Sequence, residues 1–330
     1  MTTTMRPLGR SGIEVSALGI GCWAIGGPWW SDGKAVGWGE VDDEESVRAI
    51  HRALELGVTF FDTANVYGAG HSERVLGRAL AGHRDDVVIA TKWGNTADEQ
   101  TKQAGAQDST PAGVRRQLEE SLRRLGTDHV DLYQLHIGDL PVDQTLDLLP
   151  VLDELVAEGA IRWYGWSTDD AASASAFAQA SDRVTAIQHN FSVLEDSAEV
   201  LAVCERFGLA SVNRGPLAMG LLTGKYTATS TLGADDVRGT AAPEWMQLFR
   251  DGRPAPEFLA RVEAVRDVLR SDGRTLAQGA LAYLWARSDR TIPIPGCRTV
   301  AQVEENAGAL AYGPLTKDQL ADVERLLGRE

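Results

Sequence analysis

Four residues with chemically active side chains lie at or just after the ends of predicted strands: Asp62, Tyr67, Lys92 and His136. Short apolar runs end at Asp62, Lys92 and His136. The carboxyl ends of parallel strands in an α/β protein meet on one face, where the chemistry of such proteins takes place. A phenol beside an ammonium group can donate a proton near neutral pH. The sequence therefore predicts a proton-donating active site for carbonyl reduction.

Each of the four side chains has an expected role. Tyr67 is the predicted general acid, although an unperturbed phenol has a pKa of about 10. We expect the Lys92 ammonium to stabilise the phenolate and so to lower the pKa of Tyr67. Asp62 is expected to pair with Lys92 and keep it charged and positioned. His136 is expected to hydrogen-bond the substrate oxygen or to assist proton transfer.

Other readings of the same residues are weaker. Taken singly, Tyr67 could be a rim residue and Lys92 a solvated lysine. Asp62 could likewise be a helix cap and His136 a buried histidine. Their joint placement after successive strands favours a catalytic role instead. Lys92 alone would permit a Schiff-base aldolase. Such a lysine needs a lowered pKa, and a neighbouring Asp62 would raise it. The six histidines show neither H-x-x-x-H nor H-E-x-x-H spacing, so no metal site is predicted.

Composition limits the class of protein. The 330 residues carry a formal net charge of −15, which argues against nucleic acid or an anionic membrane as the main partner. No apolar run approaches the length needed to span a membrane. Cys22, Cys204 and Cys297 are too few and too scattered for a disulfide framework or a cysteine-based zinc site. A reduced, cytoplasmic setting is expected.

The order of elements predicts a barrel. After a small hairpin over 6–16, short apolar runs alternate with amphipathic stretches. The predicted strands are 17–21, 58–61, 87–91, 130–135, 161–166, 186–189, 209–213 and 291–294. The predicted helices are 43–56, 72–80, 110–125, 143–158, 170–180, 196–207, 275–287 and 299–309, with additional ones at 257–271 and 317–328. Eight strands with helices between them predict an α/β fold of the (β/α)₈ TIM-barrel type, and residues 1–330 are expected to form a single domain.

Two long segments interrupt this alternation. Residues 24–41 are rich in Gly and Trp, and residues 214–256 are punctuated by Gly and Pro. Segments of this length are typically functional lids or disordered. Tryptophans from them and from a strand end are expected to wall the substrate pocket: Trp23, Trp29, Trp30, Trp93 and Trp245.

Two glycine motifs do not bind nucleotides in our interpretation. Residues 19–24 match G-x-G-x-x-A after a strand, but Gly26-Gly27-Pro28 cannot open the helix that a Rossmann site requires. Residues 221–225 resemble the end of a P-loop, yet Met219 stands where the first glycine should be.

A better cofactor site is predicted after the later strands. Ser167 and Gln188 could hydrogen-bond a carboxamide, and Arg298 could grip a phosphate beside the start of the last barrel helix. The barrel's usual anion site after strands seven and eight supports this placement. The full set of predicted cofactor-binding residues is Trp23, Ser167, Gln188, Arg214, Gly215, Pro216, Leu217, Gly220, Lys225, Gly296, Arg298, Gln302, Glu305 and Asn306.

With these residues in view, the chain resembles the aldo-keto reductases over essentially its whole length. The motifs that carry the resemblance are 8–12 (LGRSG), 61–64 (FDTA) with Tyr67-Gly68, 125–133 (LGTDHVDLY), 220–225 (GLLTGK) and 294–296 (IPG). The resemblance is to the bacterial and potassium-channel β-subunit-like branch. It implies an NADP(H)-dependent barrel with Asp62, Tyr67, Lys92 and His136 as catalytic tetrad. It also implies nicotinamide near Ser167 and Gln188 and the adenosine phosphate near Arg298.

Three segments depart from the family's usual pattern, and two of the departures bear on the cofactor. Thr168 replaces an Asn that commonly contacts the carboxamide, and Arg214 replaces an aromatic residue that commonly stacks on nicotinamide. A guanidinium is planar and can also stack on a ring. We expect an NADPH-dependent enzyme that reduces an aldehyde or ketone, sugar or polyketide-like carbonyls included. The alternatives are a cofactor-binding regulatory subunit with little turnover and, more remotely, the Lys92 aldolase.

Overall fold

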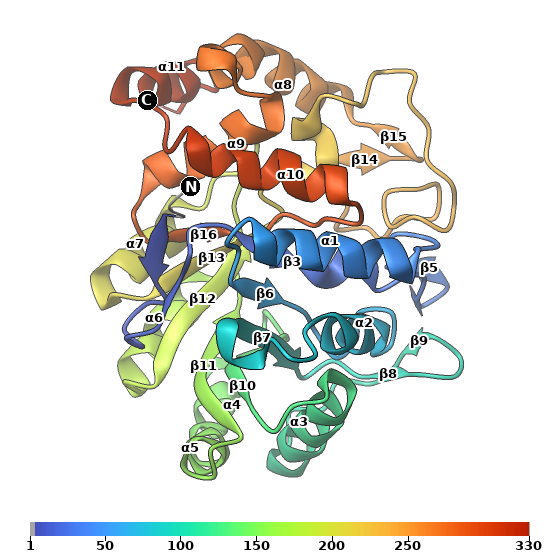
Figure 1. Ribbon diagram of the computed structural model, residues 1–330, viewed down its shortest axis with the longest axis vertical. Helices are drawn as coiled ribbons and strands as arrows, with labels where there is room; N and C mark the ends of the chain where they lie inside the picture. Colours follow the sequence, from blue (N-terminus) through green and yellow to red (C-terminus); the bar gives the residue numbers. More distant parts are fainter. Residues whose placement is uncertain (1–3, 330) are drawn as a thin grey trace.

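The computed structural model describes residues 4–329, and its central feature is an eight-stranded parallel sheet surrounded by helices (Figure 1). Neighbouring strands follow the order β16-β13-β12-β11-β10-β7-β6-β3. Their bounds are β3 Gly19–Gly21, β6 Phe60–Asp62, β7 Val88–Trp93, β10 Val130–Leu135, β11 Ile161–Ser167, β12 Val184–Asn190, β13 Ala210–Arg214 and β16 Thr291–Pro293. The first and last strands meet where Gly21 N–H donates to Pro295 O at 3.0 Å. The predicted (β/α)₈ barrel is confirmed.

The helices lie outside the strands, and most begin at a side-chain cap. Their bounds are α1 Asp43–Glu55, α2 His71–Ala79, α3 Pro111–Leu125, α4 Val142–Leu146, α5 Leu149–Ala157, α6 Ala171–Ala180, α7 Ala198–Phe207, α8 Pro256–Leu269, α9 Leu276–Arg287, α10 Val300–Gly308 and α11 Lys317–Leu326. Thr275 and Thr316 form capping boxes with Gln278 and Gln319. The single helix predicted over 143–158 is wrong. It is divided into α4 and α5, because Pro150 has no N–H to donate to the preceding turn.

Strand alternation separates two apolar cores. Inward-facing residues such as Phe60, Val88 and Leu132 fill the barrel interior, whereas the outward-facing ones pack against the helices. The predicted N-terminal hairpin is present as β1 Met5–Pro7 and β2 Glu14–Ser16, and Figure 1 shows it at the left of the barrel. Leu8 and Val15 of this hairpin are fully buried in the interior cluster, so the hairpin closes the amino end of the barrel.

The two long segments form ordered structure at the other end of the barrel, at the right in Figure 1. Strands β4 Trp30–Ser31 and β5 Lys34–Ala35 join β8 Ala97–Asp98 and β9 Gln103–Ala104 in a four-stranded sheet. The segment after β13 contains the 3₁₀ turns of η3 Ala218–Thr223 and the hairpin of β14 Phe249–Arg250 and β15 Arg253–Pro254. A bridge between Trp38 and Asp236 joins the two segments. No helix among the described residues is long and apolar enough to cross a membrane.

The interior packing of the hairpin can be tested with Leu8→Ala. Because Leu8 is completely buried in the barrel interior, we expect a loss of about 2–5 kcal/mol in the free energy of unfolding, measured by urea denaturation. Ile13→Ala is the matched control, since Ile13 of the same hairpin is only partly buried against this cluster. Equal losses for both variants would contradict an interior role for Leu8.

Candidate active site

The buried ammonium of Lys92 lies at the centre of the site. Its Nζ donates to Asp62 Oδ1 at 2.5 Å, to the Thr63 carbonyl at 2.7 Å and to the Tyr67 hydroxyl at 3.3 Å. The Lys92 side chain is fully buried, and that of Asp62 is 2 % exposed. Strand alternation explains their meeting, because Asp62 is in register with Ala90 and Lys92 follows two residues later on the same face.

Tyr67 reaches this site through a turn after β6. Its backbone N–H donates to Ala64 O at 3.2 Å, and the next residue, Gly68, has a φ of +59°. A Cβ at Gly68 would lie 1.7 Å from Gly26 O, so only glycine fits there. The turn thus brings the phenol over the strand end and against Lys92.

His136 completes the group directly after β10. Its ring is nearly perpendicular to that of Tyr67, with centroids 5.8 Å apart. The backbone holds it in place, because His136 N–H donates to Trp93 O at 2.8 Å and its carbonyl accepts from Asn95 Nδ2 at 2.8 Å. Its Nδ1 is buried and has no hydrogen-bond partner among the described residues. The sequence-predicted group of four is therefore brought together.

The pKa values follow from burial and from neighbouring charges. Burial acts to lower the pKa of Lys92, but the Asp62 carboxylate and Tyr67 outweigh it, so the net pKa is raised. Burial raises the pKa of Tyr67 above 10 and outweighs the opposing effect of Lys92. Lys92 does act to lower the pKa of Tyr67, as predicted, but the net pKa is raised, so the phenol keeps its proton. Burial, with the cations Lys92 and Arg214, lowers the pKa of His136 well below 6.5.

Two amides that contact Asp62 complete the polar group. Gln188 Nε2 donates to Asp62 Oδ2 at 2.7 Å, and Gln134 Nε2 donates to the same oxygen at 3.0 Å. Gln188 was predicted as a cofactor residue, whereas Gln134 was not predicted from the sequence. Gln134 stands two residues before His136, and residues two apart along a strand share one face. This spacing could have indicated that Gln134 belongs to the site.

Aromatic rings border the tetrad. Trp23 lies over Tyr67 with centroids 6.0 Å apart and planes at 28°, and its Nε1 donates to Val36 O at 3.0 Å. Trp38 meets the Trp23 ring edge-on at 5.2 Å, and Trp245, 57 % exposed, lies 6.3 Å from it. Trp38 was not among the residues predicted from the sequence.

Two tryptophans predicted for the substrate wall lie elsewhere in the fold. The prediction that Trp93 lines the substrate pocket is wrong, because its side chain is only 1 % exposed. Its ring lies on the outer side of the barrel, with its centroid 5.9 Å from that of Tyr133. Trp93 directly follows the inward-facing Lys92, so it must face the helices. Trp30 belongs to the small four-stranded sheet, where its N–H donates to Lys102 O, and its contact with substrate stays a prediction.

The predicted nicotinamide contacts lie at the ends of β11, β12 and β13. Ser167 ends β11 and is 5 % exposed. Arg214 ends β13 and forms an ion pair with Asp169. Thr168 Oγ1 donates to Gly138 O at 2.7 Å, so this hydroxyl supports the neighbouring loop. Gly215, Pro216 and Leu217 follow directly, and a Cβ at Gly215 would lie 2.7 Å from Asn190 Oδ1.

Three cationic side chains, Lys225, Arg238 and Arg298, lie beyond the predicted nicotinamide contacts. Burial, together with Arg238 and Arg298, lowers the pKa of Lys225. Arg298 donates to Trp38 O at 3.0 Å, and neither Lys225 nor Arg298 forms an ion pair with a carboxylate of residues 4–329. Arg238, which the sequence analysis missed, is 4 % exposed and pairs with Asp236 at 2.6 Å. A Cβ at Gly220 would lie 3.5 Å from the Arg238 guanidinium.

The residues predicted to hold the adenosine end lie at the start of α10. The Gln302 side chain accepts from Arg298 N–H at 2.8 Å, and Thr299 caps the helix. Glu305 O accepts from Gln278 Nε2 at 3.0 Å. Asn306 is 3 % exposed and donates to Cys297 Sγ at 3.2 Å. Gly296 lies beside β3, bridged to Gly21.

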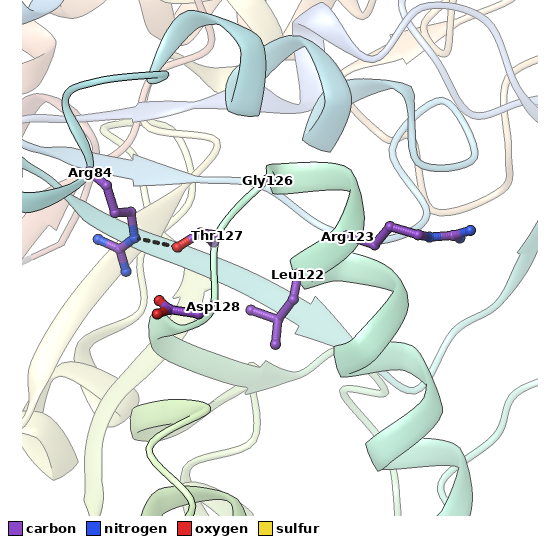
Figure 2. Close-up of a pocket in the computed structure, with 6 residues that line it drawn as sticks. All are labelled: Arg84, Leu122, Arg123, Gly126, Thr127 and Asp128. Atoms are coloured by element: carbon purple, nitrogen blue, oxygen red, sulfur yellow. Dashed lines mark hydrogen bonds between the residues drawn. The ribbon is translucent and has the colours of Figure 1, made fainter.

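A shallow hollow at the opposite end of the strands is separate from this site (Figure 2). It is lined by Arg84, Leu122, Arg123, Gly126, Thr127 and Asp128, between the end of α3 and the start of β10. Arg84 donates to Thr127 Oγ1 at 3.1 Å and pairs with the buried Asp131 at 2.8 Å. These contacts fasten the amino end of β10, and the Arg123 side chain points away from the hollow in Figure 2.

Comparisons with known proteins identify the family to which this β/α barrel, with its Lys-Asp-Tyr-His group at the carboxyl end, belongs. The aldo/keto reductase family matches residues 17–327, and the chain belongs to this family. Aldo-keto reductase YhdN of Bacillus subtilis (strain 168) is 31 % identical over 315 residues, covering 94 % of this chain and 89 % of that protein.

Solved structures agree with this assignment. The glycerol dehydrogenase AKR11B4 from Gluconobacter oxydans is 30 % identical, with a TM-score of 0.79 over 100 % of this chain and 96 % of that one. An aldo/keto reductase from Klebsiella pneumoniae, solved in complex with NADP and acetate, is 25 % identical, with a TM-score of 0.72 over 100 % and 97 % of the two chains. The Rossmann-like glycines 19–21 lie in β3 and lead into the 3₁₀ turn η1 Cys22–Ile25, so the rejection of a Rossmann helix is confirmed.

The state of His136 gives a testable pH dependence. With its pKa lowered, the folded protein binds fewer protons at His136 than the unfolded chain does below a pH of about 6.5. The stability that neutral His136 contributes is therefore present above that pH and is lost as the pH falls. We expect the His136 ring to remain neutral at pH values near 6 in ¹H–¹⁵N NMR, with His136→Gln used for assignment. Protein unfolded in urea is the control, and a folded-state midpoint near 6.5 would contradict the lowered pKa.

Proposed function

We propose that this protein reduces an aldehyde or ketone to an alcohol with NADPH, with Tyr67 as the general acid. The observation that carries the proposal is the hydrogen-bonded chain from Asp62 through Lys92 to the Tyr67 hydroxyl. Family membership and the NADP-bound relative support both the reaction type and the cofactor. The bound cofactor supplies the hydride that adds to the carbonyl carbon. The remaining chemistry belongs to the protein.

Proton transfer is the task of the tetrad. Tyr67 donates its phenolic proton to the substrate oxygen as negative charge develops there, and Lys92 stabilises the phenolate that remains. Asp62 keeps Lys92 charged, and the raised pKa of Lys92 suits this auxiliary role. Neutral His136 lies beside the Tyr67 ring, where it can donate one hydrogen bond to the substrate oxygen.

The cofactor's phosphates have a matching group of cations. Lys225 and Arg298 lack carboxylate partners among the described residues. Burial first, and then the cations Arg238 and Arg298, lower the pKa of Lys225, and a bound anion would offset the repulsion between these cations. At the nicotinamide end, Gln188 Oε1 accepts no hydrogen bond from any residue between 4 and 329, so it can accept one from a carboxamide. Planar Arg214 can stack on the ring. Trp23, Trp38 and Trp245 would border the substrate.

The two alternatives differ in how well they fit the site. A Schiff-base lysine must lose its proton, whereas Lys92 donates to three acceptors and has a raised pKa. A regulatory subunit that keeps the tetrad would have the same site, and turnover with a carbonyl substrate and NADPH distinguishes it from a reductase.

Tyr67→Phe tests the general acid. We expect the reduction of 4-nitrobenzaldehyde, followed by NADPH absorbance, to fall by about 100- to 10,000-fold, because a positioned acid is removed. NADPH affinity, measured by fluorescence, should stay within about twofold, since the phenol is not placed among the cofactor's phosphate contacts. Unchanged turnover would remove Tyr67 from this role. Tight NADPH binding by a wild-type protein without turnover on a panel of carbonyls would favour the regulatory subunit.

Arg298→Ala tests the phosphate site. We expect NADPH binding to weaken by about 1.5–3 kcal/mol, the size of a lost hydrogen bond to a charged group, and NADH binding to change far less. The reason is that NADH lacks the 2′-phosphate. Arg123→Ala, an exposed arginine on α3, is the matched control and should leave both affinities unchanged. Equal losses for the two cofactors would contradict the assignment.

A further inference from the structure

Gln134 occupies an unusual place for a neutral polar residue. It is fully buried in β10, faces the barrel interior and lies in register with Lys92 on the neighbouring strand β7. Its Nε2 donates to Asp62 Oδ2 at 3.0 Å, and its Oε1 accepts from Gln188 Nε2 at 3.3 Å. Burying a glutamine here would cost free energy unless its amide formed hydrogen bonds. Both the amide nitrogen and the amide oxygen of Gln134 form one.

The hydrogen bonds around Asp62 show why this amide matters. Lys92 donates to Oδ1, whereas Oδ2 accepts only from the amides of Gln134 and Gln188 among the described residues. These amides solvate the carboxylate without neutralising it, so its charge remains available to Lys92. Gln188 is also the residue proposed to contact the carboxamide of the cofactor. If its amide turns toward that ligand, Gln134 is the donor that remains on Oδ2.

The neighbouring strand leaves room for this arrangement. Gly165 of β11 lies in register with Gln134. A Cβ at Gly165 would lie 3.5 Å from Gln134 Cγ and 2.6 Å from Ala186 O, so a larger residue would disturb the layer in which the amides meet.

We propose that Gln134 is a positioning residue of the reductase site, which fixes the Asp62 carboxylate so that Asp62 in turn fixes Lys92 beside Tyr67. This inference rests on the proposed function for its catalytic consequence. Its structural part, the hold on Asp62, is independent of any substrate.

Gln134→Met tests the proposal with a side chain of similar length that has no amide. We expect kcat for 4-nitrobenzaldehyde to fall about tenfold or more, as for loss of one hydrogen bond to a charged group, while KM and the Kd for NADPH stay within about twofold. Tyr133→Phe is the matched control, because Tyr133 is the adjacent buried residue of β10 and its hydroxyl donates outward to Val114 O. The control should lower stability and leave kcat within about twofold.

Gln134→Glu provides a readout that a purely structural role would not move. The new carboxyl can donate to Asp62 only while it holds a proton, and two carboxylates this close oppose double ionisation. We therefore expect kcat of this variant, relative to wild type, to fall as the pH rises from 5 to 8. The ratio for Gln134→Met should stay flat. A flat ratio for Gln134→Glu, or wild-type kcat in Gln134→Met, would overturn the proposal.

A measurement without turnover separates this inference from the proposed function. The ¹³C resonance of the Asp62 carboxyl should shift in Gln134→Met and remain in place in Tyr133→Phe. If wild type reduces no carbonyl but this shift is seen, the proposed function fails and the hold on Asp62 stands. If wild type is active and the shift is absent, the role of Gln134 is refuted and the reductase stands.

Discussion

A positive charge buried inside a barrel is the constraint on which the rest of the site depends. Removing an ammonium group from water is costly by several kcal/mol unless its donors are satisfied in good geometry. Lys92 meets this condition through Asp62, the Thr63 carbonyl and the Tyr67 hydroxyl. The contact that stabilises the lysine is therefore the same contact that orients the phenol. Stability and the proton transfer that we propose are therefore joined in one interaction.

The barrel separates this polar layer from the apolar layers beneath it. Toward the amino end the interior is filled by residues such as Leu8, Phe60 and Leu132. Two residues further along the same strands the interior becomes polar, with Asp62 following Phe60 and Gln134 following Leu132. Because the apolar layers provide the packing of the barrel interior, the polar layer at the carboxyl ends of the strands can hold charged groups and amides arranged for the proposed reaction.

The two long segments determine the surroundings of the tetrad. Arg238 joins them, since its guanidinium lies 4.4 Å from the Trp38 ring centre, pairs with Asp236 and donates to Tyr226. Trp38 in turn packs edge-on against Trp23. One buried arginine therefore links the aromatic border of the site to the group of cations proposed for the phosphates.

The pKa shifts of the site residues come from burial as much as from neighbouring charges. A cation beside Tyr67 predicts a lowered pKa when only the pair is considered, but burial has the larger effect and raises it. A phenol that keeps its proton until charge develops on the substrate is still a suitable acid. Burial has the opposite effect on an imidazole, so His136 is neutral in the same surroundings.

The sequence by itself determined the barrel and the tetrad, because both are written in local patterns. Residues 130–135 form a strand with the predicted bounds, and Asp62, Lys92 and His136 stand where apolar runs end. Tertiary structure decided what depends on distant contacts and on the face of each strand. Gln134 and Asp62 meet across 72 positions of the chain, and Trp93 turns outward although it adjoins Lys92. Alternation, burial depth and pairing between remote segments act only once the strands are assembled, so a linear pattern could not assign them.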